Sequence, residues 1–369
     1  MKLQHIIFLL IFFISFLFSF PANAENQQNL QPPQALCLPG IYLDEKDLEC
    51  SLLGPAEHLT YIAWMESEII SITERYPLID ESYGTIHLDY LEVNEDDPRY
   101  KYASLEDAIQ GGKRSSRLSE GNAYVSYINQ VEDNGKTYYE LSDGYWIRGG
   151  AISRIAEPNM FRGVLLDGTP ERPFGWVLKD TETREKPGYY NDTGTGNMID
   201  RYTIIEVFDI EKTGKSYWYM VAPDQWLYQT EVALVFPSND PPEGVYVDRW
   251  IEISLFEQSI AVYDNGEMIF ASLTTTGASR TATRPGLFQI YEKHIITGMA
   301  GGSKEKGDYY NLKDVPWTMY FDERRALHAE YWHDHLGYRS SHGCANLSFP
   351  DAQWLYEWAQ MGDWVYVWE

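Results

Sequence analysis

The sequence predicts a mainly β protein, and three observations support that fold class. Aromatic residues make up 15% of the 369 residues, with 28 Tyr and 12 Trp, and such side chains suit the half-buried surface of a pleated sheet. A Tyr/Trp-rich segment with glycine turns occurs twice in the middle of the chain. Apolar residues alternate after residue 250, as they do in a strand with one buried face. The length favours two or three domains.

The first 24 residues have the features of a secretory signal peptide. Lys2 precedes an uncharged apolar stretch from Ile6 to Phe20, and Ala22 and Ala24 form the small-residue pattern of a cleavage site. An uncleaved membrane anchor is the alternative, although the apolar stretch is short for a span of about 20 residues. We therefore predict an exported protein of the periplasm, the cell wall or the extracellular space.

Residues 25–80 are predicted to form a polar leader and a disulfide-stapled segment. Disulfides persist in an oxidising compartment, and Cys37 and Cys50 lie close together in the sequence, so they are the natural pair. That pairing leaves Cys344 as a single spare thiol. Apolar residues at spacings of three and four between Leu59 and Ile72 predict a helix that begins near Pro55.

The middle of the chain contains an internal repeat, which predicts two small β modules at residues 81–156 and 157–236. The segment from Gly135 to Tyr139 recurs from Gly214 to Trp218, and each copy is followed by a Trp next to an aliphatic residue. A period near 80 residues is too long for a solenoid. The second copy resembles bacterial SH3-like barrels, which commonly accompany cell-wall enzymes and help them bind on or near peptidoglycan, so wall binding is expected through the SH3-like modules. A β module that only spaces or shields the following domain is the alternative.

A Pro-rich linker, residues 237–242, precedes a C-terminal domain at 243–369. Asn265-Gly266 predicts a tight hairpin turn between two strands. Ser348 is placed to cap a helix, with Pro350 and Asp351 in its first turn. The apolar face of that helix is predicted to comprise Trp354, Leu355 and Trp358. We expect the helix to end at Gly362, and a last strand to follow from Trp364 to Trp368.

The formal net charge of −26 limits the possible partners. Binding to nucleic acid needs basic patches, so a nucleic-acid partner is not expected. An anionic membrane surface is disfavoured for the same reason.

Histidines cluster just before the spare thiol in the sequence. Four of the eight histidines lie between His328 and His342, and Cys344 follows two residues later. A thiol becomes a good nucleophile when a neighbouring His takes its proton and the resulting cation stabilises the thiolate. Backbone N–H groups around Gly343 and Cys344 could then point at the oxyanion of an acyl transfer.

Two other interpretations of this segment stay open on the residues alone. His328, His333, His335 and His342 with Cys344 could bind zinc, although their spacing matches no familiar ligand pattern. Alternatively, Cys344 is a buried thiol that acts as a small hydrophobe, and the histidines are surface residues.

The segment Ser341-His342-Gly343-Cys344-Ala345-Asn346 resembles the SHGCxN signature of YkuD-type L,D-transpeptidases. The upstream His328 matches the catalytic histidine of that family. Residues 283–288 resemble its TPxGxF segment, displaced by Arg284, and residues 315–321 resemble its VPxxMYF strand. The resemblance covers roughly residues 246–369. It implies a β sandwich-like catalytic domain with one or two helices, preceded by the SH3-like modules.

The resemblance also implies a role for individual residues. Cys344 would be the nucleophile and His328 its base, oriented by the backbone carbonyl of Ala329. The other residues would shape the oxyanion site (His342 and Gly343), support the loop and the substrate (Ser341 and Asn346), or line the donor pocket (Tyr320). Arg339 could bind a substrate carboxylate, but a surface ion pair explains it equally well. His333 and His335 are expected to be exposed loop residues at the rim of the cleft.

The implied substrate is a peptidoglycan stem peptide. Cys344 would attack the L,D peptide bond before the terminal D-Ala, and an amine of a neighbouring stem would resolve the thioester into a 3→3 cross-link. No metal or cofactor is needed, and carbapenems are expected to acylate Cys344. With water or a protein amine as the acceptor, the enzyme would be an L,D-carboxypeptidase or a protein-anchoring enzyme. A non-catalytic wall-binding protein is the alternative from another class.

Overall fold

The computed structural model describes residues 35–36, 50–51, 75–94, 100–118, 121–188, 193–278 and 282–369. The chain divides into two compact units, Met1–Gly54 and Pro55–Glu369. In the first unit, the described strands β1 (Ala35–Leu36) and β2 (Cys50–Ser51) pair in parallel. The predicted signal peptide, Cys37 of the predicted Cys37–Cys50 bridge and the helix near Pro55 lie outside the described residues, so these calls stay predictions.

The first sheet of the C-terminal domain is built on a meander of three strands. Its six strands are β10 (Val164–Leu165), β21 (Glu267–Leu273), β20 (Ser259–Asp264), β19 (Trp250–Ser254), β27 (Trp364–Trp368) and β22 (Gly286–Gln289), in that order across the sheet. The predicted hairpin is confirmed, because β20 and β21 are antiparallel and Asn265 and Gly266 between them have φ values of 53° and 76°. Since β10 pairs with β21, the start of the predicted second module belongs to this sheet.

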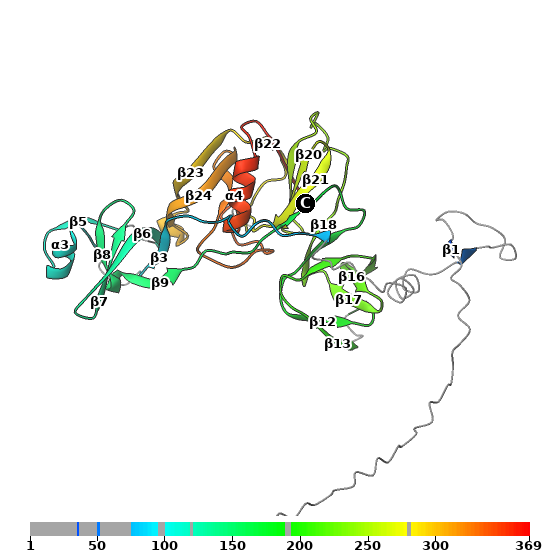
Figure 1. Ribbon diagram of the computed structural model, residues 1–369, viewed down its shortest axis with the longest axis horizontal. Coiled ribbons are helices and arrows are strands. Elements are labelled where there is room, and N and C mark those ends of the chain that lie inside the picture. The colour runs from blue at the N-terminus through cyan, green and yellow to red at the C-terminus, as the bar shows by residue number, and fades with distance from the viewer. Residues whose placement is uncertain are drawn as a thin grey trace, which may run out of the picture. The chain divides into compact units, whose positions relative to one another are not determined.

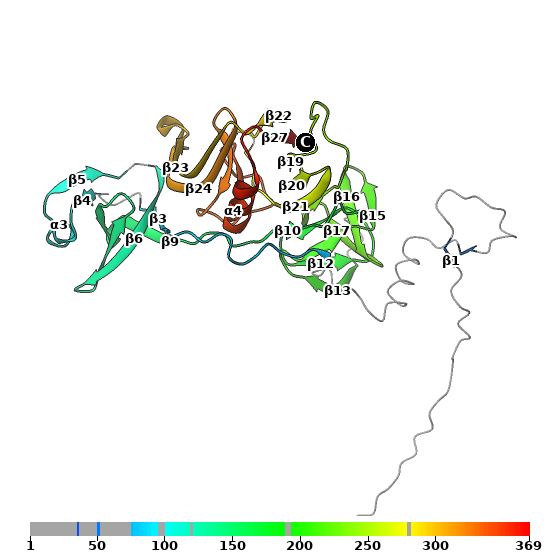
Figure 2. The ribbon, with the colours of Figure 1, turned by 45° about the horizontal axis from the view of Figure 1, so that its top comes forward.

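A second sheet carries the segment matched to the VPxxMYF strand, the predicted catalytic histidine and the end of the SHGCxN-like segment, whereas residues 283–288 lead into β22 of the first sheet. It contains β23 (Glu292–Gly301), β24 (Tyr310–Asp322), β25 (Arg325–Ala329) and β26 (Ala345–Leu347). β23, β24 and β25 are antiparallel neighbours, whereas β25 and β26 pair in parallel. β23 and β24 form a long hairpin that extends from the domain (Figures 1 and 2).

Helix α4 (Phe349–Trp358) packs against β24 and β25. The predicted cap is confirmed, since the Ser348 side chain accepts a hydrogen bond from the Asp351 N–H at 3.3 Å. The helix ends at Trp358, before the predicted Gly362, which lies in the turn that leads into β27.

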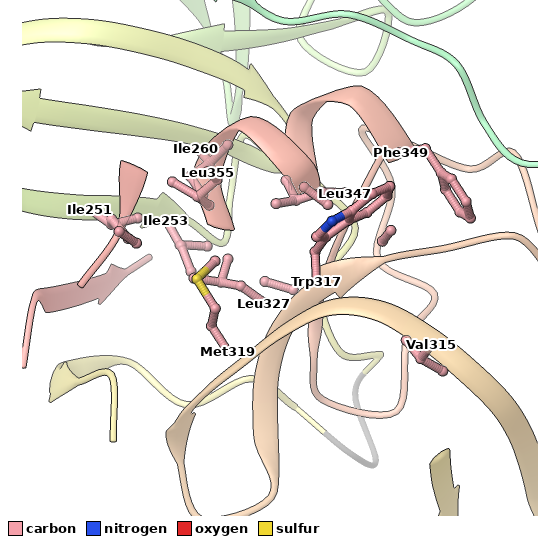
Figure 3. Packing of buried hydrophobic residues seen from close by; sticks show 14 of the residues in the cluster. Ile251, Ile253, Ile260, Val315, Trp317, Met319, Leu327, Leu347, Phe349 and Leu355 are labelled. Atoms are coloured by element: carbon pink, nitrogen blue, oxygen red, sulfur yellow. The ribbon is translucent and has the colours of Figure 1, made fainter. Parts of the chain in front are cut away.

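The core of this domain lies between its two sheets and α4. Figure 3 shows aliphatic side chains of the first sheet, Trp317 and Met319 of β24, and Leu355 of α4 meeting in one cluster. Met319, Leu327 and Leu355 are fully buried. This packing fixes the ends of β25 and β26 relative to each other.

The predicted first module continues the second sheet. Its elements are β3 (Asp89–Val93), β4 (Tyr100–Tyr102), α3 (Leu105–Gln110), β5 (Arg114–Arg117), β6 (Asn122–Asp133), β7 (Lys136–Leu141), β8 (Trp146–Arg148), a 3-10 turn (Gly149–Ala151) and β9 (Ile152–Ala156). β6 pairs in parallel with β24. Tyr90 of β3 stacks on Tyr331 with ring centroids 3.7 Å apart, inside the core of the C-terminal domain. The first module is therefore joined to that domain by a shared sheet and a shared core.

The predicted second module forms two small sheets. One contains β14 (Ile204–Glu206), β11 (Phe174–Val177) and β18 (Val232–Val235), and the other contains β13 (Gly194–Ile199), β12 (Thr181–Arg184), β17 (Gln225–Tyr228), β16 (Ser216–Ala222) and β15 (Asp209–Thr213). The sequence repeat corresponds to one meander that occurs twice, as β6–β7–β8 and as β15–β16–β17. The likeness to SH3 barrels stays a prediction.

No helix among the described residues is long and apolar enough to cross a membrane.

Candidate active site

His328 is fixed at the end of a buried strand. It lies in β25 with 2% of its surface exposed, and its Nδ1 is 2.9 Å from the backbone oxygen of Ala329. Because a carbonyl oxygen only accepts, Nδ1 carries the proton, and Nε2 is left as the acceptor. The ring is thus held in the tautomer that a general base requires.

Parallel pairing of β25 with β26 places Cys344 near His328. His328 is in register with Asn346, and Cys344 directly precedes β26. Both Cys344 and His328 line a cavity of ≈ 130 Å³, together with Met299, Tyr310, Leu312, Trp332, His333, Ser340, Ser341, His342 and Asn346. Two segments 16 residues apart in sequence (328 to 344) therefore contribute to one site.

Burial keeps both candidate catalytic groups uncharged. It raises the pKa of the Cys344 thiol to about 11, although the Ala326 N–H and the charge of Arg325 oppose that shift. Burial also lowers the pKa of His328 to about 4, against the hydrogen bond to Ala329. At neutral pH the pair is therefore a thiol and a neutral imidazole. The prediction that His328 takes the proton of Cys344 stays a prediction.

Ser341 organises the loop that carries the thiol. Its Oγ donates to the Cys344 carbonyl oxygen at 2.6 Å and accepts from the Gly343 N–H at 3.1 Å. The Gly343 N–H is therefore engaged, which corrects the expectation that it would point at an oxyanion. Gly343 has a φ of 119°, which only glycine adopts readily. The hydroxyl of Thr283 donates to the Gly343 carbonyl oxygen at 2.9 Å and anchors the loop from the other side.

Two tyrosines of β24 lie in the electrostatic field of the thiol. Burial raises the pKa of Tyr320, and the charge of ionised Cys344 adds to the shift. The pKa of Tyr310 is raised to about 12 by the same two causes in the same order. Tyr310 lines the cavity, and its ring lies 4.8 Å from that of the exposed His342. The sequence pointed to Tyr320 and His342 but not to Tyr310.

Arg339 lies outside the described lining of the cavity. Its Nε donates to the Leu255 carbonyl oxygen at 3.0 Å, and Nη2 pairs with Glu369 at 3.3 Å. This geometry favours the surface ion pair over a substrate clamp. Arg284, the residue that displaces the TPxGxF-like segment, pairs instead with the buried carboxylate of Asp322, which also accepts from Arg325 at 3.1 Å.

Sequence reasoning assigned no role to Glu330 and His333. Glu330 is completely buried, and its Oε2 accepts from the Asn346 amide at 2.7 Å and lies 3.2 Å from His333 Nε2. His333 lines the cavity, so it is more than an exposed rim residue. The sequence carried no signal for Glu330, because its burial depends on tertiary packing.

Both upstream modules contact the loop between Glu330 and Gly337. Arg154 of the first module donates to the Trp332 carbonyl oxygen at 2.9 Å. Arg201 of the second module pairs with Asp334 at 2.8 Å. A Cβ on Gly337 would lie 2.2 Å from Leu178, so this glycine permits close packing against the second module. The modules thus support the loop that carries His333.

Residues 248–367 match the YkuD family model, the L,D-transpeptidase catalytic domain. The YkuD segment contains all of the cavity-lining residues described above. Within the described residues, no three His, Cys, Asp or Glu side chains are arranged to hold a metal ion.

The chain is also similar to individual proteins. It is 26% identical over 168 residues to the putative L,D-transpeptidase YciB of Bacillus subtilis (strain 168), which corresponds to 42% of this chain and 77% of that protein. Among solved structures, an L,D-transpeptidase (Yku) from Stackebrandtia nassauensis is 28% identical, with 34% of this chain and 57% of that chain covered and a TM-score of 0.27. The ertapenem-acylated catalytic domain of the E. faecium L,D-transpeptidase is 25% identical, and the match covers 34% of this chain and 100% of that chain with a TM-score of 0.30.

Proposed function

We propose that this protein is a peptidoglycan L,D-transpeptidase that acts through a Cys344 thioester. The observation that carries the proposal is the single cavity, within the YkuD segment, that contains the Cys344 thiol and a neutral, oriented His328 ring. That arrangement can perform acyl transfer without a metal ion or cofactor.

In the first half-reaction, His328 Nε2 accepts the thiol proton as Sγ attacks the carbonyl carbon of the L,D peptide bond. The tetrahedral intermediate collapses when His328 returns this proton to the nitrogen of the terminal D-Ala. One amide bond breaks, one thioester bond forms, and D-Ala leaves as a neutral amine.

In the second half-reaction, the side-chain amine of a diamino acid in a neighbouring stem attacks the thioester. His328 removes a proton from this amine and passes it to the departing thiolate, which regenerates the neutral pair. The product is a 3→3 cross-link. Water as the acceptor would make the enzyme an L,D-carboxypeptidase, and a protein amine would make it a protein-anchoring enzyme.

The test uses the mature chain, a disaccharide-tetrapeptide muropeptide and mass spectrometry, with Cys344→Ala as the control. A cross-linked dimer that lacks one D-Ala, absent with the variant, is the expected product. Tripeptide alone would assign the carboxypeptidase reaction. Absence of both products, together with no carbapenem adduct on Cys344, would leave the non-catalytic wall-binding protein as the better explanation.

We also propose that the chain is exported by residues 1–24.

We further propose that the first module contacts the wall. A cavity of ≈ 740 Å³ in this module contains Arg114 stacked over Tyr100 at 4.0 Å and Arg148 over Tyr102 at 5.2 Å. Guanidinium groups suit the carboxylates of stem peptides. In the Cys344→Ala background, Arg114→Gln should reduce cosedimentation with purified sacculi.

The matched control for this binding experiment is Arg172→Gln in the second module. Arg172 lies over Phe208 at 5.3 Å, so the variant removes a comparable exposed arginine elsewhere. Equal loss of binding in both variants would point to a general charge effect and not to a site in the first module.

A further inference from the structure

His333 is a second imidazole in the cavity of the catalytic pair. It shares that cavity with Cys344 and His328, and 17% of its side chain is exposed. Its Nε2 lies 3.2 Å from Glu330 Oε2 and 3.2 Å from Ser340 Oγ. His335 stacks on its other side with ring centroids 4.9 Å apart. The ring therefore has a defined position and is held by specific partners.

Glu330 is the common partner of His333 and of the signature segment. Its side chain is fully buried, and one carboxylate oxygen contacts both the His333 ring and the Asn346 amide, the latter at 2.7 Å. A buried carboxylate is costly unless it is paired and hydrogen-bonded. Burial raises the pKa of Glu330, and its contacts with His333 and Asn346 oppose that shift, so these two side chains are the partners that stabilise the buried carboxylate.

We propose that Glu330 is a positioning residue, which holds Asn346 and a second imidazole, that of His333, beside the catalytic pair. This inference rests on the proposed function, because it concerns the same cavity. Glu330 therefore contacts two parts of the site: Asn346 of β26, and His333, which lines the cavity and lies 3.2 Å from the Oγ of Ser340 in the loop that carries the thiol. The anchors of the surrounding loop, Arg154 and Arg201, keep this arrangement in place.

Several ionisable groups surround His333. Glu330 and His335 lie on its own loop, and His328 lies on β25, where the charge of His333 lowers the pKa of the catalytic ring. Tyr310, His342 and Cys344 complete the ionisable lining of the cavity in the described part of the chain. The effect of His333 is therefore expected on the acid side of the pH profile.

The experiment measures the second-order rate of Cys344 acylation by a carbapenem between pH 4 and 8. Glu330→Gln keeps an acceptor for the Asn346 amide but replaces the carboxyl group that His333 faces with an amide. His333→Gln removes the imidazole itself. Each variant should slow acylation by about tenfold to a hundredfold, the scale of a small displacement in an active site. The double variant should be no slower than either single variant, because both remove one interaction.

The pH profile separates positioning from a purely structural role. Without His333, the acid-side fall of the acylation rate should move to higher pH, because His333 lowers the pKa of His328. Exposed His87 provides a matched control, and His87→Gln should leave both rate and profile unchanged. Thermal unfolding of each variant reports whether it is folded.

Different outcomes distinguish this inference from the proposed function. If the wild-type protein forms no carbapenem adduct, the proposed function and the inference fall together. If it is acylated and both single variants react as fast as wild type, the inference alone is overturned. A slow Glu330→Gln beside a wild-type-like His333→Gln would also overturn it, since Glu330 would then act only through Asn346.

Discussion

Alkylation of Cys344 should reveal a neutral thiol. The perturbation is a change of pH in the presence of iodoacetamide, which reacts with the thiolate form. Burial sets the pKa of Cys344 at about 11, whereas its unperturbed value is 9.0. His328 is uncharged above a pKa of about 4, so it offers no cation to stabilise the thiolate at neutral pH.

The expected magnitude follows from these two pKa values. At pH 7 the thiolate fraction is about 10⁻⁴ for a pKa of 11 and about 10⁻² for a pKa of 9.0, so Cys344 should react roughly 100-fold more slowly than an unperturbed thiol. Its rate should then rise about tenfold per pH unit up to pH 10, because each unit increases the thiolate fraction by that factor.

The assay follows the Cys344 peptide by mass spectrometry, so the other two cysteines do not interfere. A short unstructured cysteine peptide in the same buffers gives the reference rate, and His328→Gln tests the contribution of the imidazole. The variant should show the same slope as the wild-type protein. A rate that is flat between pH 5 and 9 in the wild type, and about 100-fold lower in His328→Gln, would refute the neutral pair.

Other consequences concern stability and support of the loop. Burial raises the pKa of Glu257 to about 7, so the folded chain holds a proton that the unfolded chain loses above pH 4.5. The free energy of unfolding should therefore fall as pH rises from 4.5 to 7. In urea unfolding, Glu257→Gln should be more stable than the wild type by up to roughly 3 kcal/mol at pH 8, with little difference at pH 5. Ser348→Ala removes the cap of α4 and should cost about 1 kcal/mol. Leu355→Ala, in a fully buried position, should cost about 2–5 kcal/mol in the same unfolding assay; a cost below 1 kcal/mol would contradict the packing in Figure 3. Arg201→Met should barely change the melting temperature, because its pair with Asp334 is partly exposed, yet it should slow carbapenem acylation; an unchanged rate would argue against support of the loop by the second module.

Local features of the structure could be predicted because their causes are local. The Asn265-Gly266 turn depends on two residues that tolerate positive φ, and the α4 cap depends on one hydroxyl placed three residues before an N–H. The repeat was visible because both meanders use the same turn chemistry. The proximity of Cys344 and His328 came from the family resemblance, since spacing alone left the zinc site and the buried thiol open.

Contacts between distant segments were decided only by the tertiary structure. The parallel pairing of β6 with β24, and the stacking of Tyr90 on Tyr331, join the first module to the C-terminal domain, although nothing in the local pattern of either segment specifies the other. Likewise, the salt bridge from Arg201 to Asp334 links residues 133 positions apart.

The sequence and the folded structure each determine a different part of the chemistry of the site. The sequence by itself determined which groups are present: a thiol, an imidazole and a glycine-containing loop. Burial determined their charge, since it raises the pKa of the Cys344 thiol and lowers that of His328, and folding determined that the Gly343 N–H binds Ser341. Desolvation and hydrogen-bond partners depend on everything that surrounds a group in space, so only the folded chain specifies them.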